Sequence, residues 1–132
     1  MKRKTALVCM IELLVILVSA CEASGITGKW ELTAYRIRET GEIVQRDNLG
    51  TSDTEIKLAA MGKSTMTIGS NGKLQIEFPE ADINIGGTYT VDGSVIHIYN
   101  EGEDTPSLGM ELVGDTIEFP ALYQATFIYT KK

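Results

Sequence analysis

Cysteine and histidine are almost absent from this chain of 132 residues, which contains two cysteines and one histidine. A zinc site needs several thiolate or imidazole ligands, so the composition argues against one. The single histidine, His97, alternates with the apolar residues Ile96 and Ile98, and we expect it to face solvent. It is also the only candidate base for Ser/His/Asp catalysis, and no Gly-x-Ser-x-Gly elbow accompanies it. We therefore predict no metal site, no cofactor and no enzymatic activity.

Positive charge is also scarce, because 12 lysines and arginines stand against 18 aspartates and glutamates, for a formal net charge of −6. The sequence has no basic stripe with interleaved aromatics and no polybasic segment, so we expect contact neither with nucleic acid nor with anionic lipid headgroups. Acidic residues gather at positions 101–104 and at Glu77, Glu80 and Asp82. Loop acids are usually just solvated. Paired carboxylates in a cleft can hydrolyse glycosides and loop acids can bind calcium loosely, and both alternatives stay open.

No apolar run is long enough to span a bilayer, which takes about 20 consecutive apolar residues. The longest run, residues 5–18, is shorter and is interrupted by Glu12. Three basic residues precede it at positions 2–4, and the small residues Ser19 and Ala20 follow it. Because this layout is typical of a secretory signal, we predict that residues 1–20 form a signal peptide.

The signal ends in the stretch Val18-Ser19-Ala20-Cys21, which resembles the lipobox of bacterial lipoproteins. The resemblance implies cleavage before Cys21 and a diacylglyceryl thioether on its sulfur, with acyl chains such as palmitate. Two acyl chains hold a protein stably on a membrane, where a single chain is marginal. We expect a lipid-anchored protein outside the cytoplasm, at the cell membrane or an outer membrane. The alternative is an ordinary signal peptide that leaves Cys21 as a free thiol.

Cleavage before Cys21 would change the charge and the thiol content of the chain. It removes three positive residues and one negative residue, so the formal charge falls from −6 to −8. Cys9 leaves with the signal and Cys21 carries lipid, so no disulfide can form. We interpret residues 21–26 as the lipidated N-terminus and a short linker. Its residues 22–26 reach about 17 Å at roughly 3.3 Å each, which holds the domain, residues 27–132, close to the membrane.

Alternation of apolar and polar residues predicts strands through most of this domain. Trp30, Leu32 and Ala34 share one face of the first strand. A turn at Thr40-Gly41 then leads into a short segment, residues 42–45, that can pair back as a hairpin.

One helix is predicted, beginning at Ser52. Ser52 and Glu55 form a capping box, in which the hydroxyl and the carboxylate each satisfy a free backbone N–H group. Gly62 suits the left-handed position after the last turn. A helix of two to three turns is not stable alone, so its apolar face must pack on the domain. The apolar residues at helical spacing are Ile56, Ala59 and Ala60.

The second half of the chain predicts a series of hairpins. Turn pairs at Asn71-Gly72, Asp92-Gly93 and Gly114-Asp115 separate alternating runs, and Asn-Gly between such runs is a strong hairpin signal. Residues 78–87 interrupt the pattern with a proline and a glycine pair, and we predict a loop followed by the start of a strand. A two-layer sandwich would fit this spacing, but a closed barrel leaves no exposed edge.

We therefore predict an all-β fold, an antiparallel meander closed into a small barrel of about eight strands with one short helix. The large apolar residues of the strands fall on its inner face. The inner-face residues that could line a ligand cavity are Met66, Ile76, Phe78, Tyr89, Ile96, Met110, Phe119 and Phe127.

Gly28-x-Trp30 opens the first strand, and Gly87-x-Tyr89-x-Val91 forms a later one. With a short helix between them, this order resembles the bacterial lipocalin-like lipoproteins of the calycin superfamily. The resemblance covers most of residues 25–132. It implies that Gly28 and Trp30 close one barrel end and that a basic residue near the last strand packs over the tryptophan. In this sequence Lys131 and Lys132 are available for that role.

Two functions remain open. The resemblance implies a membrane-tethered binding protein that captures a small apolar molecule at one mouth of the barrel. The alternative is an interaction protein with a solid core, which acts through its acidic loops on another envelope protein as an inhibitor or an assembly factor. A barrel of this type can be filled by its own side chains or open to one small ligand. In either case we expect a monomer.

Overall fold

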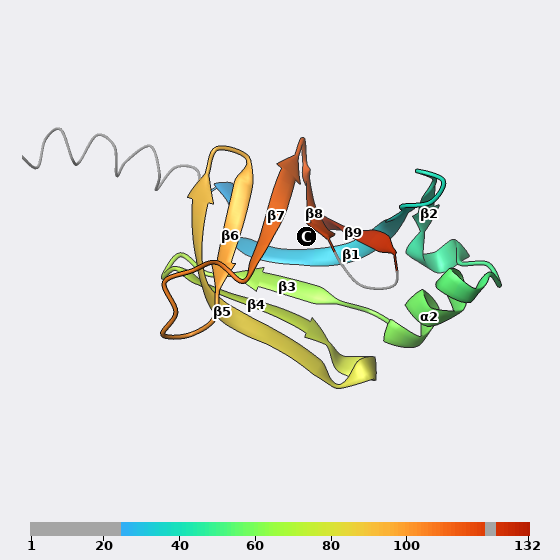
Figure 1. Ribbon diagram of the computed structural model, residues 1–132, viewed down its shortest axis with the longest axis horizontal. Coiled ribbons are helices and arrows are strands. Elements are labelled where there is room, and N and C mark those ends of the chain that lie inside the picture. Colours follow the sequence, from blue (N-terminus) through green and yellow to red (C-terminus); the bar gives the residue numbers. More distant parts are fainter. Residues whose placement is uncertain (1–24, 121–123) are drawn as a thin grey trace, which may run out of the picture.

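The structure is a computed structural model that describes residues 25–120 and 124–132 (Figure 1). The predicted signal peptide and Cys21 lie outside the described residues. The helices and strands are β1 (Gly28–Ile37), β2 (Ile43–Gln45), η1 (Arg46–Asn48), α2 (Asp53–Met61), β3 (Thr65–Ile68), β4 (Lys73–Phe78), η2 (Pro79–Ala81), β5 (Ile83–Asp92), β6 (Val95–Tyr99), β7 (Leu108–Val113), β8 (Thr116–Pro120) and β9 (Ala125–Lys131).

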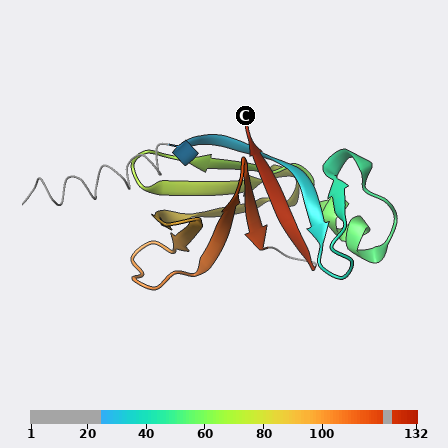
Figure 2. The ribbon, with the colours of Figure 1, turned by 90° about the horizontal axis from the view of Figure 1, so that it is seen from above.

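Eight antiparallel strands close into a barrel, which confirms the predicted fold class. Neighbouring strands pair in the order β1, then β3 to β9, and β9 returns to pair with β1. The short strand β2 pairs with the second half of β1 and lies beside the barrel rather than in its wall. Figures 1 and 2 both show α2 beyond one end of the barrel, near β2. We call this the helix end, and the opposite end the Trp30 end.

The observed turns confirm the hairpins that were predicted for the second half of the chain. Gly72, Gly93 and Gly114 each have a positive φ, and each lies between paired antiparallel strands. The segment 78–87 was predicted less well. A 3₁₀ turn follows Pro79, Asp82 has a φ of 55°, and β5 already begins at Ile83 and runs through both glycines. The proline thus ends one strand without preventing an early start of the next.

The first strand contains a β-bulge at Thr33, which overturns one predicted face. Leu32 pairs with Tyr129 and Ala34 pairs with Ile128, so Thr33 is an extra residue that the backbone pairing between β1 and β9 skips. The bulge shifts the alternation by one residue. As a result Ala34 faces outward, and Tyr35 takes the inner position that strict alternation had predicted for Ala34.

Helix α2 begins as predicted but packs by different residues. The Ser52 hydroxyl accepts a hydrogen bond from the Glu55 backbone N–H, at 3.2 Å, and the Glu55 carboxylate accepts one from the Gly50 N–H, at 2.6 Å. Hydrogen bonds from the Ser52 hydroxyl and the Gly50 N–H lower the pKa of Glu55. The side chains that α2 buries are Leu58 and Met61, whereas Ile56 is 55% exposed. The predicted apolar face is therefore wrong. Leu58 and Met61 pack on the domain, whereas Ala59 and Ala60 are exposed like Ile56.

Candidate functional site

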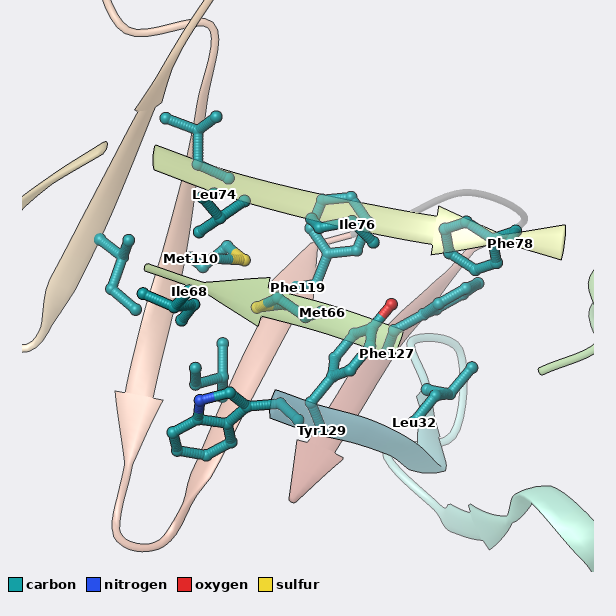
Figure 3. Packing of buried hydrophobic residues seen from close by; sticks show 14 of the residues in the cluster. Leu32, Met66, Ile68, Leu74, Ile76, Phe78, Met110, Phe119, Phe127 and Tyr129 are labelled. Carbon is teal, nitrogen blue, oxygen red and sulfur yellow. The ribbon is translucent and has the colours of Figure 1, made fainter. Parts of the chain in front are cut away.

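The predicted ligand-lining residues do lie together, but they bury one another. All eight belong to one hydrophobic cluster, and none is more than 7% exposed. Phe127 lies at its centre: ring centroids of Tyr35, Phe78 and Phe119 are 5.1, 5.7 and 6.2 Å away, all edge to face. Figure 3 shows Phe78, Phe119 and Phe127 on the inner side of the strands among the other buried side chains. The arrangement is that of a packed core.

Three hydroxyl groups interrupt this apolar interior. Tyr129 Oη and Ser64 Oγ are hydrogen-bonded at 2.7 Å, and Ser64 is 2% exposed. Tyr35 Oη is buried and has no hydrogen-bond partner among the described residues. Burial raises the pKa of Tyr35 and of Tyr129, and for Tyr129 it outweighs the opposing effect of the Ser64 hydrogen bond. All three groups are therefore neutral at ordinary pH.

At the Trp30 end, Lys131 lies over the indole ring of Trp30. The indole Nε1 donates a hydrogen bond to the Ile26 carbonyl at 2.8 Å, and Lys131 Nζ lies 5.8 Å from the ring centroid. Lys131 Nζ also donates to the Gly25 carbonyl at 3.0 Å. Gly28 has a φ of 133°, and a Cβ there would lie 3.3 Å from Lys131 Cε, so a glycine suits this position.

These contacts shorten the linker that the sequence suggested. Ile26 is 4% exposed and belongs to the hydrophobic cluster, so it is part of the domain rather than of the linker. The folded domain therefore includes Ile26 and Gly25, whose carbonyl accepts a hydrogen bond from Lys131 Nζ.

A hollow of about 570 Å³ opens on the outer wall, which we call the outer groove. It lies across β3, β4 and β5, and the loop between β6 and β7 adds one side. In β4 the buried Leu74 and Ile76 alternate with exposed Lys73 and Gln75, so the latter two point away from the core. The residues that line the groove are Thr67, Gly69, Asn71, Lys73, Leu74, Gln75, Gly86, Gly87, Thr88 and Glu101.

Two adjacent positions in β5, 86 and 87, differ in whether the structure requires a glycine there. A Cβ at Gly87 would lie 2.1 Å from the Tyr99 carbonyl oxygen, so no other residue fits there without moving β6. At Gly86 the nearest atom to a Cβ is the Leu74 carbonyl oxygen at 3.9 Å, and its φ is outside the left-handed range. Neither packing nor the backbone requires glycine at position 86. Its missing side chain keeps the floor of the outer groove open.

Hydrogen bonds fix the polar wall of the outer groove. Asn71 Oδ1 accepts from the Lys73 backbone N–H at 3.1 Å, and Gln75 Nε2 donates to Asn84 Oδ1 at 3.0 Å. Behind the turn, Tyr89 Oη donates to the Gly69 carbonyl at 2.8 Å. Lys73 and Glu101 lie in the same groove, and neither has an ion-pair partner within the described part of the chain. The groove is thus preformed, and it holds two opposite charges without an ion-pair partner in the described chain.

Comparisons with protein families, with curated proteins and with solved structures find no match. The antiparallel barrel of eight strands with one helix is consistent with a lipocalin-like fold.

A second, smaller hollow of about 300 Å³ lies on the outer wall over β6 to β9. Glu111 and Glu118 pair across its strands, and Glu118 forms an ion pair with Arg36. Met110 is the one predicted ligand-lining residue that borders either hollow. His97 lies half-buried on this outer wall, opposite Gly109.

Metal and membrane features were sought in residues 25–120 and 124–132. No group of three or more histidine, cysteine, aspartate or glutamate side chains there could hold a metal ion. The acidic residues 101–104 are all exposed. None of the helices in this part of the chain has the length and apolar character needed to cross a bilayer.

Sequence reasoning missed the outer groove. Its walls come from a turn, three strands and a distant loop, so no single stretch of sequence contains it. The one signal was the glycine pair at 86 and 87, which had indicated a bulge.

Proposed function

We propose that this protein is a membrane-anchored binding protein whose barrel is a filled scaffold and whose ligand site is the outer groove. One observation carries the proposal. The residues predicted to line an inner cavity are at most 7% exposed and pack on each other, whereas a hollow of about 570 Å³ opens on the outer wall. This volume is within the range of about 300 to 1,000 Å³ that small-molecule sites occupy.

The anchor is part of the proposal and rests on the lipobox resemblance at Cys21. Residues 22–24 separate Cys21 from Gly25, and three extended residues with their flanking bonds reach roughly 13 Å. The Trp30 end would then lie next to the membrane. Thr67 of the outer groove pairs with Lys29 of β1, so the groove begins at this same end. A ligand would be met close to the membrane surface.

A photo-crosslinking residue in place of Gln75, in intact cells, tests the site. The matched control carries the same residue in place of Thr130, which faces outward on β9, away from the groove. We expect a discrete adduct at position 75 and none at position 130. Equal adducts at both positions would contradict the proposal.

Capture of an apolar molecule inside the barrel is the second candidate. The buried Tyr35 hydroxyl has no partner within the described residues, and a polar group on a ligand would supply one. Such a ligand would have to displace core side chains. Methyl signals of Met66 and Met110 report on the interior in an NMR titration with a fatty acid. If they shift at stoichiometric ratios, the interior is the binding site and the proposal for the groove fails.

A further inference from the structure

The outer groove holds two opposite charges that the protein leaves unpaired. Lys73 lies on β4, and Glu101 lies in the loop after β6. Both side chains are exposed, and the ion pairs Arg36–Glu118 and Arg46–Asp47 involve other residues. A molecule that lies in the groove therefore meets a cation and an anion on the same surface. This pattern is complementary to a zwitterion.

The same groove is also lined by neutral hydrogen-bonding groups. Thr67 and Thr88 offer hydroxyls, and Asn71 and Gln75 offer amides. Each of these side chains can both donate and accept hydrogen bonds, as peptide groups need. The lining contains no aromatic side chain, so the groove lacks the stacking surface on which bases bind.

Gly86 adds a steric argument. A side chain there would fit the fold, since the nearest atom to a Cβ lies at 3.9 Å, but it would project from the outer wall into the groove. Glycine inside a strand is unfavourable, because it adds backbone entropy to the unfolded chain and packs no side chain. The open floor at this position gives an extended main chain room to approach β5.

We infer that the outer groove binds a short peptide with free termini, whose carboxylate contacts Lys73 and whose ammonium group contacts Glu101. The inference rests on the proposed function and names the ligand class of the same site. The hollow of about 570 Å³ is larger than one amino acid requires and suits a few residues.

The test uses full-length protein in detergent micelles and alanine peptides of one to four residues, followed by NMR and calorimetry. We expect one length to bind best. N-acetylation or C-terminal amidation of that peptide should weaken binding roughly tenfold, because each removes a charge-assisted hydrogen bond. Lys73→Gln should abolish the preference for a free carboxylate only, and Glu101→Gln the preference for a free amine only. Lys57→Gln, on α2, is the control and should change neither preference.

Gly86→Val separates binding from folding. We expect it to leave the melting temperature unchanged or higher and to weaken peptide binding at least tenfold. Blocked and free peptides of equal affinity, or no binding at millimolar peptide, would overturn the inference. If the crosslink at position 75 still forms and Gly86→Val removes it, only the ligand class is wrong. If Gly86→Val leaves that crosslink unchanged, the groove is not the site and the proposed function fails as well.

Discussion

Lys131 Nζ lies 5.8 Å from the centroid of the Trp30 ring and binds the Gly25 carbonyl, so the last strand holds the beginning of the domain. Lys131 is exposed, and a cation–π contact at an exposed site contributes about 0.5 to 1 kcal/mol. We expect Lys131→Met to lower the free energy of unfolding by about 1 kcal/mol. Lys131→Arg should retain it, since guanidinium groups stack well on aromatic rings. Lys132→Met is the matched control, and urea unfolding followed by Trp30 fluorescence is the measurement.

Replacing a buried tyrosine by phenylalanine should change the stability of the protein differently at positions 129 and 35. Tyr129→Phe leaves the buried Ser64 hydroxyl without its partner, which costs about 1 to 3 kcal/mol. Tyr35→Phe removes a hydroxyl that has no partner in the described chain, so stability should stay equal or rise. Chemical unfolding of both variants checks this pair. A large loss for Tyr35→Phe would mean that its hydroxyl has a partner, such as an internal water.

Alkaline pH should destabilise the protein through Tyr129. Burial raises the pKa of this tyrosine in the folded chain above its ordinary value of about 10 in the unfolded chain. The folded chain therefore holds the proton more tightly, and this stabilisation is complete below about pH 10 and is lost as the pH rises further. Urea unfolding from pH 8 to 11 should show the decline. In Tyr129→Phe the decline should be shallower, and an equal slope would exclude Tyr129 as the cause.

The bulge at Thr33 predicts that the protein tolerates deletion of Thr33 but not deletion of Glu31. Deleting Thr33 keeps Leu32 and Tyr35 inside and Ala34 outside, so we expect a cooperative transition weakened by about 1 to 3 kcal/mol. Deleting Glu31 would turn the buried Trp30 to the outer wall and abolish cooperative unfolding. Circular dichroism melting of the two deletions makes the comparison. Equal damage would show that the bulge does not set the register.

Lipid on Cys21 predicts that Cys21→Ala releases a folded domain. Lys131 and Trp30 hold the start of the domain through the carbonyls of Gly25 and Ile26, so we expect the melting temperature of the domain not to change. Cell fractionation should find the variant outside the membrane fraction. A variant that remains with the membrane would refute the lipid anchor.

The parts of the fold that were predictable from sequence depend on neighbouring residues. Asn71-Gly72, Asp92-Gly93 and Gly114-Asp115 define their hairpins locally, and the Ser52 cap defines the start of α2. The errors concern distant partners. The bulge at Thr33 exists because β1 pairs with β9, and the buried face of α2 depends on where the barrel end lies.

The candidate site was less predictable than the fold, for a related reason. Alternation identified Met66, Phe78 and Phe127 as inner residues, but it cannot tell whether inner side chains fill the space between them. The outer groove joins Lys73 to Glu101, which are far apart in sequence, and its floor is defined by a side chain that is missing at Gly86.

The closing pair of strands also sets the order in which the protein can fold. Thr33 and Ile128 are hydrogen-bonded although 95 residues separate them in sequence. Contacts between such distant segments form late, because the entropy of closing the loop is lost before the contact stabilises anything. A chain that emerges from its N-terminus onward cannot complete the barrel until residues 125–131 are free. Until then the barrel stays open, and a chain in this state can pass through a translocation channel.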